Sequence, residues 1–180
     1  MALHETLARI LNLQVYKINH EPFAVAEIPK RLLFVGKVTR NVATLEGLAE
    51  KYGVEITLVV PEDGSNAVHT EMRSAESLMS QLPTRIKLAI VAKDLSGVDT
   101  NDYDAVFIDI MDDALRVPFT KECWRVIREG GWNAIRANLK SPLRLFKDLG
   151  MLDIKSIKEE SIWYGRVRKD ESVHFPKARK

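Results

Sequence analysis

The stretch RLLFVGKVTRNVATL, residues 31–45, decides the fold class of this chain. Its first part, RLLFVG, is a continuous apolar run, which is typical of a strand buried on both faces of a sheet. Its second part spaces apolar residues as a helix does, and a turn with one glycine, Gly36, separates the two. Many nucleotide-binding α/β domains carry several glycines here, because glycine lets the backbone approach the ligand closely. The stretch therefore predicts an α/β domain, and it leaves open whether one glycine suffices for a nucleotide-type cofactor.

The rest of the chain repeats this alternation of strand and helix. Alternation indicates a parallel sheet covered on both faces, because parallel strands need crossover connections. The last two apolar segments follow each other directly, and such a pair at the edge of a parallel sheet is expected to be antiparallel. The sequence predicts an α/β fold, a three-layer αβα sandwich with a mostly parallel sheet and an antiparallel C-terminal strand pair. The expected strands are 31–36, 54–60, 86–92, 103–110, 132–139, 153–161 and 162–169, and the expected helices are 39–53, 65–82, 119–131 and 141–151.

Three segments are distinguished by their composition. Residues 1–29 begin with apolar residues at helical spacing, which predicts an amphipathic helix, and continue with short extended pieces at 15–18 and 23–28. Residues 30–169 form the α/β domain. Residues 170–180 are a basic tail. Glycines are expected to close two of these helical segments: Gly130 with Gly131 closes the one at 119–131, and Gly150 closes the one at 141–151.

The composition limits the classes of protein to consider. The chain has 180 residues, 46% of them hydrophobic, which is enough for one sizeable core and a single domain. The formal charge of +2 is too small to imply nucleic-acid binding. The single cysteine, Cys123, excludes an intrachain disulfide and favours a cytoplasmic location. Apolar runs are far shorter than the roughly 20 residues that span a membrane, so no membrane span is expected.

The order of elements and the residues at their turns resemble the class I S-adenosylmethionine-dependent methyltransferase family over residues 30–169. The turn FVGKVTRN resembles the family's glycine-rich first motif, with Gly36 at the first glycine and Val38 and Arg40 at the other two. The resemblance implies a Rossmann-like fold, S-adenosylmethionine as cofactor, and methyl transfer to an acceptor that stays unidentified. It leaves the catalytic residue unknown, because the sulfonium already carries the activated methyl group and the protein mainly positions the nucleophile, with a base added if the nucleophile needs deprotonation.

The resemblance also implies cofactor contacts at the later turns. Glu62, with Asp63 as its neighbour, follows the strand whose end carries the acid that binds the ribose hydroxyls. Asp94 corresponds to the acid that accepts a hydrogen bond from the adenine amine. Asp109 corresponds to a residue near the amino acid end of the cofactor or the transferred methyl group. With Gly36, these residues are the predicted cofactor site: Gly36, Glu62, Asp94 and Asp109.

Each of these positions has a structural interpretation as well. Residues 61–64 also fit an ordinary turn before a helix N-cap at Ser65 or Asn66. Asp109 also fits a strand-end residue that caps a following turn. The cluster of Asp109 with Asp112 and Asp113 has the chemistry of a divalent-metal site, but the further carboxylate expected after the next strand is missing, and no metal is predicted.

The sequence lacks a phosphate loop, a zinc-protease HExxH, a CxxC and a GxSxG motif, so kinase, zinc-protease and serine-hydrolase functions have no support. Methyl transfer is the leading prediction, and it requires a cleft at the ends of the strands after Val35 and Val60. The alternative is a non-catalytic relative that serves as a binding or assembly module, such as a homodimer, with the side chains of Val38 and Arg40 filling that cleft. A third class is a nucleic-acid-associated protein that uses the basic C-terminus.

Overall fold

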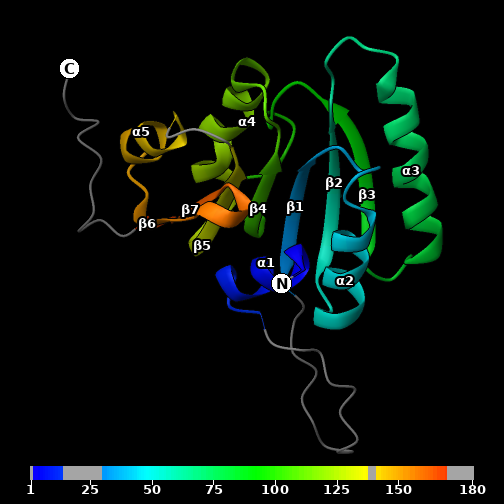
Figure 1. Ribbon diagram of the computed structural model, residues 1–180, viewed down its shortest axis with the longest axis horizontal. Helices are drawn as coiled ribbons and strands as arrows, with labels where there is room; N and C mark the ends of the chain where they lie inside the picture. Colours follow the sequence, from blue (N-terminus) through cyan, green and yellow to red (C-terminus); the bar gives the residue numbers. More distant parts are fainter. Residues whose placement is uncertain (1, 14–29, 138–140, 170–180) are drawn as a thin grey trace, which may run out of the picture.

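One seven-stranded sheet forms the centre of the protein. The computed structural model describes residues 2–13, 30–137 and 141–169. The strand order is β3-β2-β1-β4-β5-β7-β6, and helices lie on both sides of the sheet (Figure 1). The strands are β1 Arg31–Gly36, β2 Glu55–Pro61, β3 Ile86–Ala92, β4 Tyr103–Asp109, β5 Ile127–Arg136, β6 Leu152–Ile157 and β7 Ile162–Arg166. The helices are α1 Leu3–Ile10, α2 Val42–Tyr52, α3 Ala67–Gln81, α4 Asp113–Val126 and α5 Ser141–Asp148, and a short 3-10 helix, η1 Lys158–Glu160, follows β6.

The direction of the strands confirms the fold predicted from the sequence. Strands β1 to β5 pair in parallel, whereas β7 is antiparallel to both β5 and β6. The chain builds β1, β2 and β3 toward one edge, and then returns to the other side of β1 to add β4 and β5. The strand order therefore reverses between β1 and β4. In open α/β sheets, ligands bind at such a reversal, outside the carboxyl ends of the strands.

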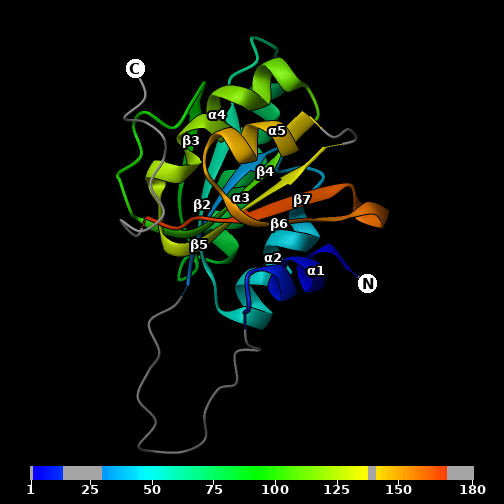
Figure 2. The same cartoon turned by 90° about the vertical axis from the view of Figure 1, so that its left-hand side faces the viewer.

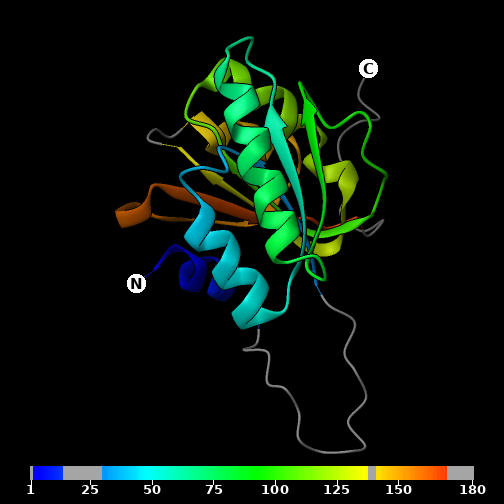
Figure 3. The ribbon, with the colours of Figure 1, turned by 90° about the vertical axis from the view of Figure 1, so that its right-hand side faces the viewer.

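The two faces of the sheet bury two separate hydrophobic clusters. Successive side chains of a strand point to opposite faces, so β1 contributes Leu32 and Phe34 to one cluster and Leu33 and Val35 to the other. The first cluster contains side chains of α1, α2 and α3, and Figure 3 shows α3 lying along β2 and β3. The second contains side chains of α4 and α5, which Figure 2 shows on the other side of the sheet from α1 and α2. The sheet is thus the middle layer of a three-layer sandwich.

The predicted N-terminal helix is present as α1, which packs against α2. Gly47 of α2 allows this contact, because a Cβ at Gly47 would lie 2.5 Å from the His4 ring. Thr6 also donates a 2.7 Å hydrogen bond to Glu160 beyond β6, so α1 contacts both α2 and the β6–β7 end of the sheet. The extended pieces expected at 15–18 and 23–28 and the tail at 170–180 lie outside the described residues.

The helix predicted at 119–131 is wrong at both ends. Helix α4 begins at Asp113, and β5 already starts at Ile127, so Gly130 and Gly131 lie inside a strand instead of ending a helix. The β4–β5 ladder is irregular there, and a Cβ at Gly131 would lie 2.4 Å from the carbonyl oxygen of Asp104. Glycine occurs where two strands come very close together as well as at helix ends, so the glycine pair led to a wrong prediction of a helix end. Gly150, with φ +74°, does follow the last turn of α5 as predicted.

The connection from β3 to β4 differs from the other parallel crossovers because residues 93–102 contain no helix. Leu95 and Val98 from this loop are buried against the sheet in place of a helix. The cover is partial, since Leu88 on the edge strand β3 keeps 48% of its surface exposed. Within residues 2–13, 30–137 and 141–169, none of the helices has both the length and the apolar character needed to cross a membrane.

Candidate functional site

A cavity of about 290 Å³ opens at the carboxyl ends of β1, β2 and β4, where the strand order reverses. One wall is the turn after β1, with Gly36, Lys37 and Arg40. A second wall is the end of β2 with the following residues, including Asp63, and the start of α3. The third is the segment after β4, from Asp109 onward. The cleft that methyl transfer requires after Val35 and Val60 is therefore present.

Gly36, the last residue of β1, allows β1 and β4 to lie close together where the turn begins. Its φ is +156°, and a Cβ at this position would lie 2.7 Å from the carbonyl oxygen of Asp109, its partner in the parallel ladder. Val38 and Arg40 do not have positive φ. The side chain of Val38 points away from the cavity lining and is fully buried in the core with Phe34. One glycine is thus sufficient for the conformation of this turn.

Asp109, at the end of β4, anchors the turn after β1. Its side chain is fully buried, and it accepts hydrogen bonds from Arg40 Nε at 3.0 Å and Arg40 Nη2 at 2.6 Å. Asn41 Nδ2 donates to the same carboxylate at 2.8 Å, and Arg136 Nη1 at the end of β5 lies 3.5 Å away. A buried carboxylate is costly unless it is paired and hydrogen-bonded, and here it is both. Asp109 is engaged with protein groups on both of its oxygens.

Glu71 holds the same turn from the side of α3. It is buried, and it accepts hydrogen bonds from the Thr39 backbone N–H at 3.0 Å and from Thr39 Oγ1 at 2.6 Å. The sequence analysis missed Glu71. A signal was present, because Glu71 falls at helical spacing in line with Val68, Ala75 and Leu78, where an apolar residue is expected. The turn is therefore held by two carboxylates from different elements.

The segment after β4 is fixed by Arg116 and Asp112. Arg116 is buried in α4 and donates to the carbonyl oxygens of Ile110 at 2.8 Å and Met111 at 3.3 Å. Asp112 caps α4 by accepting a 3.1 Å hydrogen bond from the Leu115 N–H. The capping role that the sequence left open for Asp109 thus belongs to Asp112.

No family model matches the chain, and no curated protein matches it in sequence. Solved structures do match. A protein from Methanococcus maripaludis, assigned to the S-adenosyl-L-methionine-dependent methyltransferases, aligns over 94% of this chain and 84% of its own, with a TM-score of 0.60 and 10% identity. The tRNA (m1A58) methyltransferase TrmI from Aquifex aeolicus aligns over 93% and 68%, with a TM-score of 0.56 and 18% identity. The chain has the fold of the class I methyltransferases.

Other methyltransferases of this fold are considerably longer than the chain. Phosphoethanolamine N-methyltransferase 2 from Haemonchus contortus, solved in complex with S-adenosyl-L-methionine, matches 86% of this chain at a TM-score of 0.55 and 16% identity. The chain spans only 38% of that enzyme. Identities at this level show a shared fold, so what the site binds must be argued from its own residues.

Of the residues implied by the methyltransferase resemblance, two lie together and two lie elsewhere. Gly36 and Asp109 both line the cavity. Glu62 does not line it. Glu62 is exposed, and its backbone N–H donates to the carbonyl oxygen of Ala92 on the neighbouring strand. Asp63, the next residue, does line the cavity. The residue that lines the cavity is thus one position later than the one predicted.

Asp63 and Asp94 each accept hydrogen bonds from a serine two residues ahead. Asp63 Oδ1 accepts from Ser65 Oγ at 2.6 Å and from the Ser65 N–H at 2.9 Å, and these bonds lower the pKa of Asp63. Asp94 accepts from the Ser96 N–H at 3.0 Å, which lowers the pKa of Asp94. Asp94 lies in the loop after β3 and is not among the residues that line the cavity. Both carboxylates are ionised at neutral pH.

The side-chain cap expected before α3 and the possible metal cluster at Asp109 have different outcomes from Asp112, which does cap α4. Asn66 precedes α3, as one interpretation of the sequence expected, but its side chain makes no capping hydrogen bond. In the described part of the chain, no group of three or more His, Cys, Asp or Glu side chains is arranged to hold a metal ion. The carboxylate of Asp109 is instead satisfied by the cations of Arg40 and Arg136.

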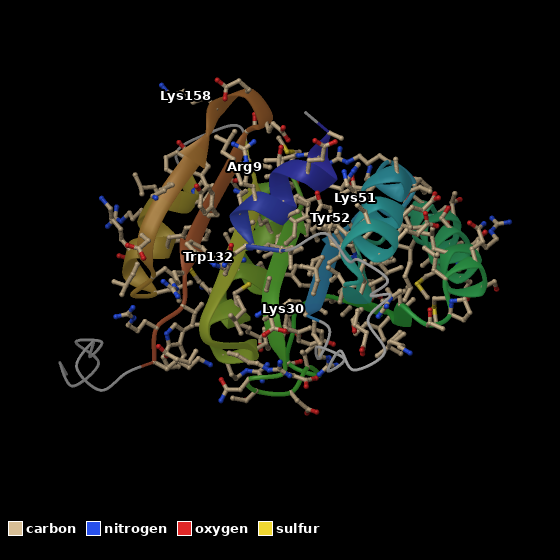
Figure 4. The ribbon with its side chains drawn as sticks, turned by 90° about the horizontal axis from the view of Figure 1, so that it is seen from below. Arg9, Lys30, Lys51, Tyr52, Trp132 and Lys158 are labelled. Carbon is tan, nitrogen blue, oxygen red and sulfur yellow. The ribbon has the colours of Figure 1, made fainter. Side chains whose placement is uncertain are left out.

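A second cavity, of about 210 Å³, lies at the opposite end of the sheet. It is lined by Lys30, Trp132 and Arg166 among others, and Figure 4 shows Lys30 and Trp132 at this end of the molecule, together with Arg9 and Lys51. The Arg166 guanidinium lies 5.7 Å from the centre of the Trp132 ring. Because this cavity is at the amino ends of the strands, the first cavity is the better candidate for the ligand site of a methyltransferase fold.

Proposed function

We propose that the chain binds S-adenosylmethionine in the cavity at the carboxyl ends of β1, β2 and β4, and that it transfers the methyl group to an acceptor. The observation that supports this most is the position of the cavity at the strand-order reversal. The cavity is lined by the turn after β1, which Gly36 allows to lie close to β4. The fold it shares with a Haemonchus contortus enzyme solved with S-adenosyl-L-methionine supports it as well. The acceptor and any catalytic residue stay unassigned.

The residues of the cavity are compatible with this cofactor. Asp63 has its Oδ1 bonded to Ser65 and its other oxygen available, so it is suited to accept hydrogen bonds from ribose hydroxyls in place of Glu62. Gly36 lets the turn that lines the cavity lie close to β4, and Asp109 positions this turn through Arg40 and Asn41. The contact between Asp94 and the adenine amine stays a prediction. Bound S-adenosylmethionine supplies the activated methyl group, and the chain has to orient an acceptor and exclude water.

A non-catalytic binding or assembly module is the second candidate, and one observation favours it. Arg40 stands where the first motif of the methyltransferases carries a glycine, and its side chain forms part of the cavity wall. In this case the cavity would be too small for the cofactor. A cytoplasmic location and a homodimer are proposals as well. The lone cysteine favours the cytoplasmic location.

Calorimetric titration with S-adenosylmethionine and, separately, with S-adenosylhomocysteine distinguishes the two candidates. We expect saturable binding of about one ligand per chain, together with a higher melting temperature. A ligand at about one hundred times its Kd stabilises the folded state by about 2.7 kcal/mol, which is easily measured. Absence of both heat and thermal stabilisation at millimolar concentrations would reject the methyltransferase proposal and favour the module.

A further inference from the structure

Arg40 lies in the cavity wall with much of its hydrogen-bonding capacity unused. A guanidinium has five N–H groups, and Arg40 uses one on Nε and one on Nη2 for Asp109. The remaining groups, on Nη1 and Nη2, have no partner among the described residues. The side chain is 43% exposed, whereas that of Asp109 is fully buried. Asp109 therefore fixes one edge of the guanidinium and leaves the other edge accessible.

The environment of Arg40 is that of a preorganised anion receptor. The pair with Asp109 keeps the guanidinium in one orientation, so less side-chain entropy is lost when a ligand binds. Asp109 is also close to the second cation, Arg136, at 3.5 Å. Asp109 is thus shared by two guanidinium groups, and its charge does not cancel both.

The cavity contains charges of both signs, which points to a ligand with charges of both signs. Lys37 and Arg40 are its cations, and the acidic residues Asp63, Glu71, Asp109 and Asp112 are also among the residues that line it. Glu71 is bonded to Thr39 and Asp109 to Arg40. A simple anion such as phosphate would be repelled by these carboxylates, whereas an α-amino acid group carries a carboxylate for Arg40 and an ammonium that the carboxylates attract. Planar carboxylates fit the guanidinium edge with two parallel hydrogen bonds.

We propose that Arg40 binds the α-carboxylate of the ligand, so that the cavity selects a nucleoside that carries an amino acid over the same nucleoside without it. This inference rests on the proposed function and assigns a residue to the recognition of the cofactor's amino acid end. The arginine at the glycine position is then a recognition group, and its presence does not close the site.

The test compares two compounds on the same protein variants. S-adenosylhomocysteine and 5′-methylthioadenosine share the adenosine and the thioether, and only the first has the amino acid group. In Arg40→Gln, the affinity for S-adenosylhomocysteine should fall by about tenfold or more, as expected for the loss of charge-assisted hydrogen bonds. The affinity for 5′-methylthioadenosine should fall by much less, because the loss of the Arg40–Asp109 pair affects the turn for both compounds alike and only S-adenosylhomocysteine also loses a carboxylate contact. Arg40→Lys keeps the positive charge but lacks the planar pair of N–H donors, so it should bind S-adenosylhomocysteine more tightly than Arg40→Gln but less tightly than the unmodified protein.

Lys37→Gln is the matched control, because Lys37 is the other cation of the same turn and has no ion-pair partner in the described residues. Its effect should be the same for both compounds. Equal losses in Arg40→Gln for both compounds would show that Arg40 only shapes the cavity, and a selective loss in Lys37→Gln would assign the carboxylate to Lys37; either result overturns the inference. If the unmodified protein binds both compounds equally, the proposed function stands and this inference fails. If it binds neither, both fail.

Discussion

Asp109 and Asp94 follow two strands of the same parallel sheet, and yet they have opposite environments. Asp109 ends β4, which lies between β1 and β5 in the middle of the sheet. Groups from the turn after β1 and from the end of β5 reach it, and its side chain is fully buried. Asp94 follows β3 at the edge of the sheet, in a loop without a helix, and its recorded partner is Ser96 in the same loop. The number of neighbouring strands decides how much of the structure an acidic residue can hold together.

The two residues also differ in whether they anchor a loop to the rest of the fold. The turn after β1 is held by Asp109 from β4 and by Glu71 from α3. The loop at 93–102 is held by α4, where Glu122 accepts from the Leu95 N–H and Arg125 donates to the carbonyl oxygens of Leu95 and Val98. Asp94 bonds only to Ser96 of the same loop among the described residues. Substitution of Asp109 should therefore affect the whole fold, whereas substitution of Asp94, which does not anchor its loop, should have a local effect.

Removing the carboxylate of Asp109 should have the largest effect. Asp109→Ala leaves Arg40, Asn41 and Arg136 without their common acceptor, and breaking one side of a buried pair costs about 3–5 kcal/mol. The free energy of unfolding from urea denaturation measures this loss. Asp109→Asn keeps the size of the side chain and separates the effect of charge from that of the cavity. A loss below about 1 kcal/mol in the alanine variant would contradict the role of Asp109 as the anchor of the turn.

The second effect concerns the close approach of β1 and β4. In Gly36→Ala, the added Cβ would lie 2.7 Å from the Asp109 carbonyl oxygen, and the backbone has a positive φ, so we expect a loss of about 2–3 kcal/mol. The matched control is Gly97→Ala in the loop after β3, where no atom lies within 4 Å. Thermal and urea unfolding of both variants check this. Equal stabilities for the two variants would show that the contact at Gly36 relaxes easily.

Glu71 should contribute less than Asp109, because Glu71→Ala removes two hydrogen bonds and leaves Thr39 near solvent. We expect a loss of about 1–2 kcal/mol. The control is Glu76→Ala, because Glu76 is exposed on the same helix and forms no ion pair with the residues that the structure describes; its effect should stay within about 0.5 kcal/mol. Urea denaturation of the two variants provides the comparison. If Glu76→Ala is as destabilising as Glu71→Ala, the effect belongs to the helix and not to the turn.

Asp94 should have the smallest effect on stability. Asp94→Ala removes one hydrogen bond to Ser96 in a loop, so the free energy of unfolding should change by less than about 0.5 kcal/mol. If Asp94 contacts the adenine of a bound cofactor, the same variant should nevertheless weaken binding of S-adenosylhomocysteine in a calorimetric titration. Unchanged affinity would remove Asp94 from the proposed site, which would then consist of residues that line the cavity.

The sequence predicted most of the elements because their signals are local. Apolar runs identified β1 to β4, helical spacing identified α1 to α3, and the paired segments at the end identified β6 and β7. The error at Gly130 and Gly131 has the same origin, since a glycine pair has no local signal that separates a helix end from an irregular strand. The register between β4 and β5 makes that choice, and it depends on residues more than 20 positions apart.

By itself, the sequence determined the order of strands and helices, the reversal into an antiparallel pair, and the turns at which ligands of such folds bind. Periodicity and turn residues carry this information, because they act over a few neighbouring positions. Only the tertiary structure decided that Gly36 suffices for the first turn, that Asp63 faces the cavity instead of Glu62, and that Asp109 pairs with Arg40. These outcomes depend on which strands become neighbours, and the long-range packing that brings α3, β4 and β5 to the turn after β1 has no counterpart in local sequence.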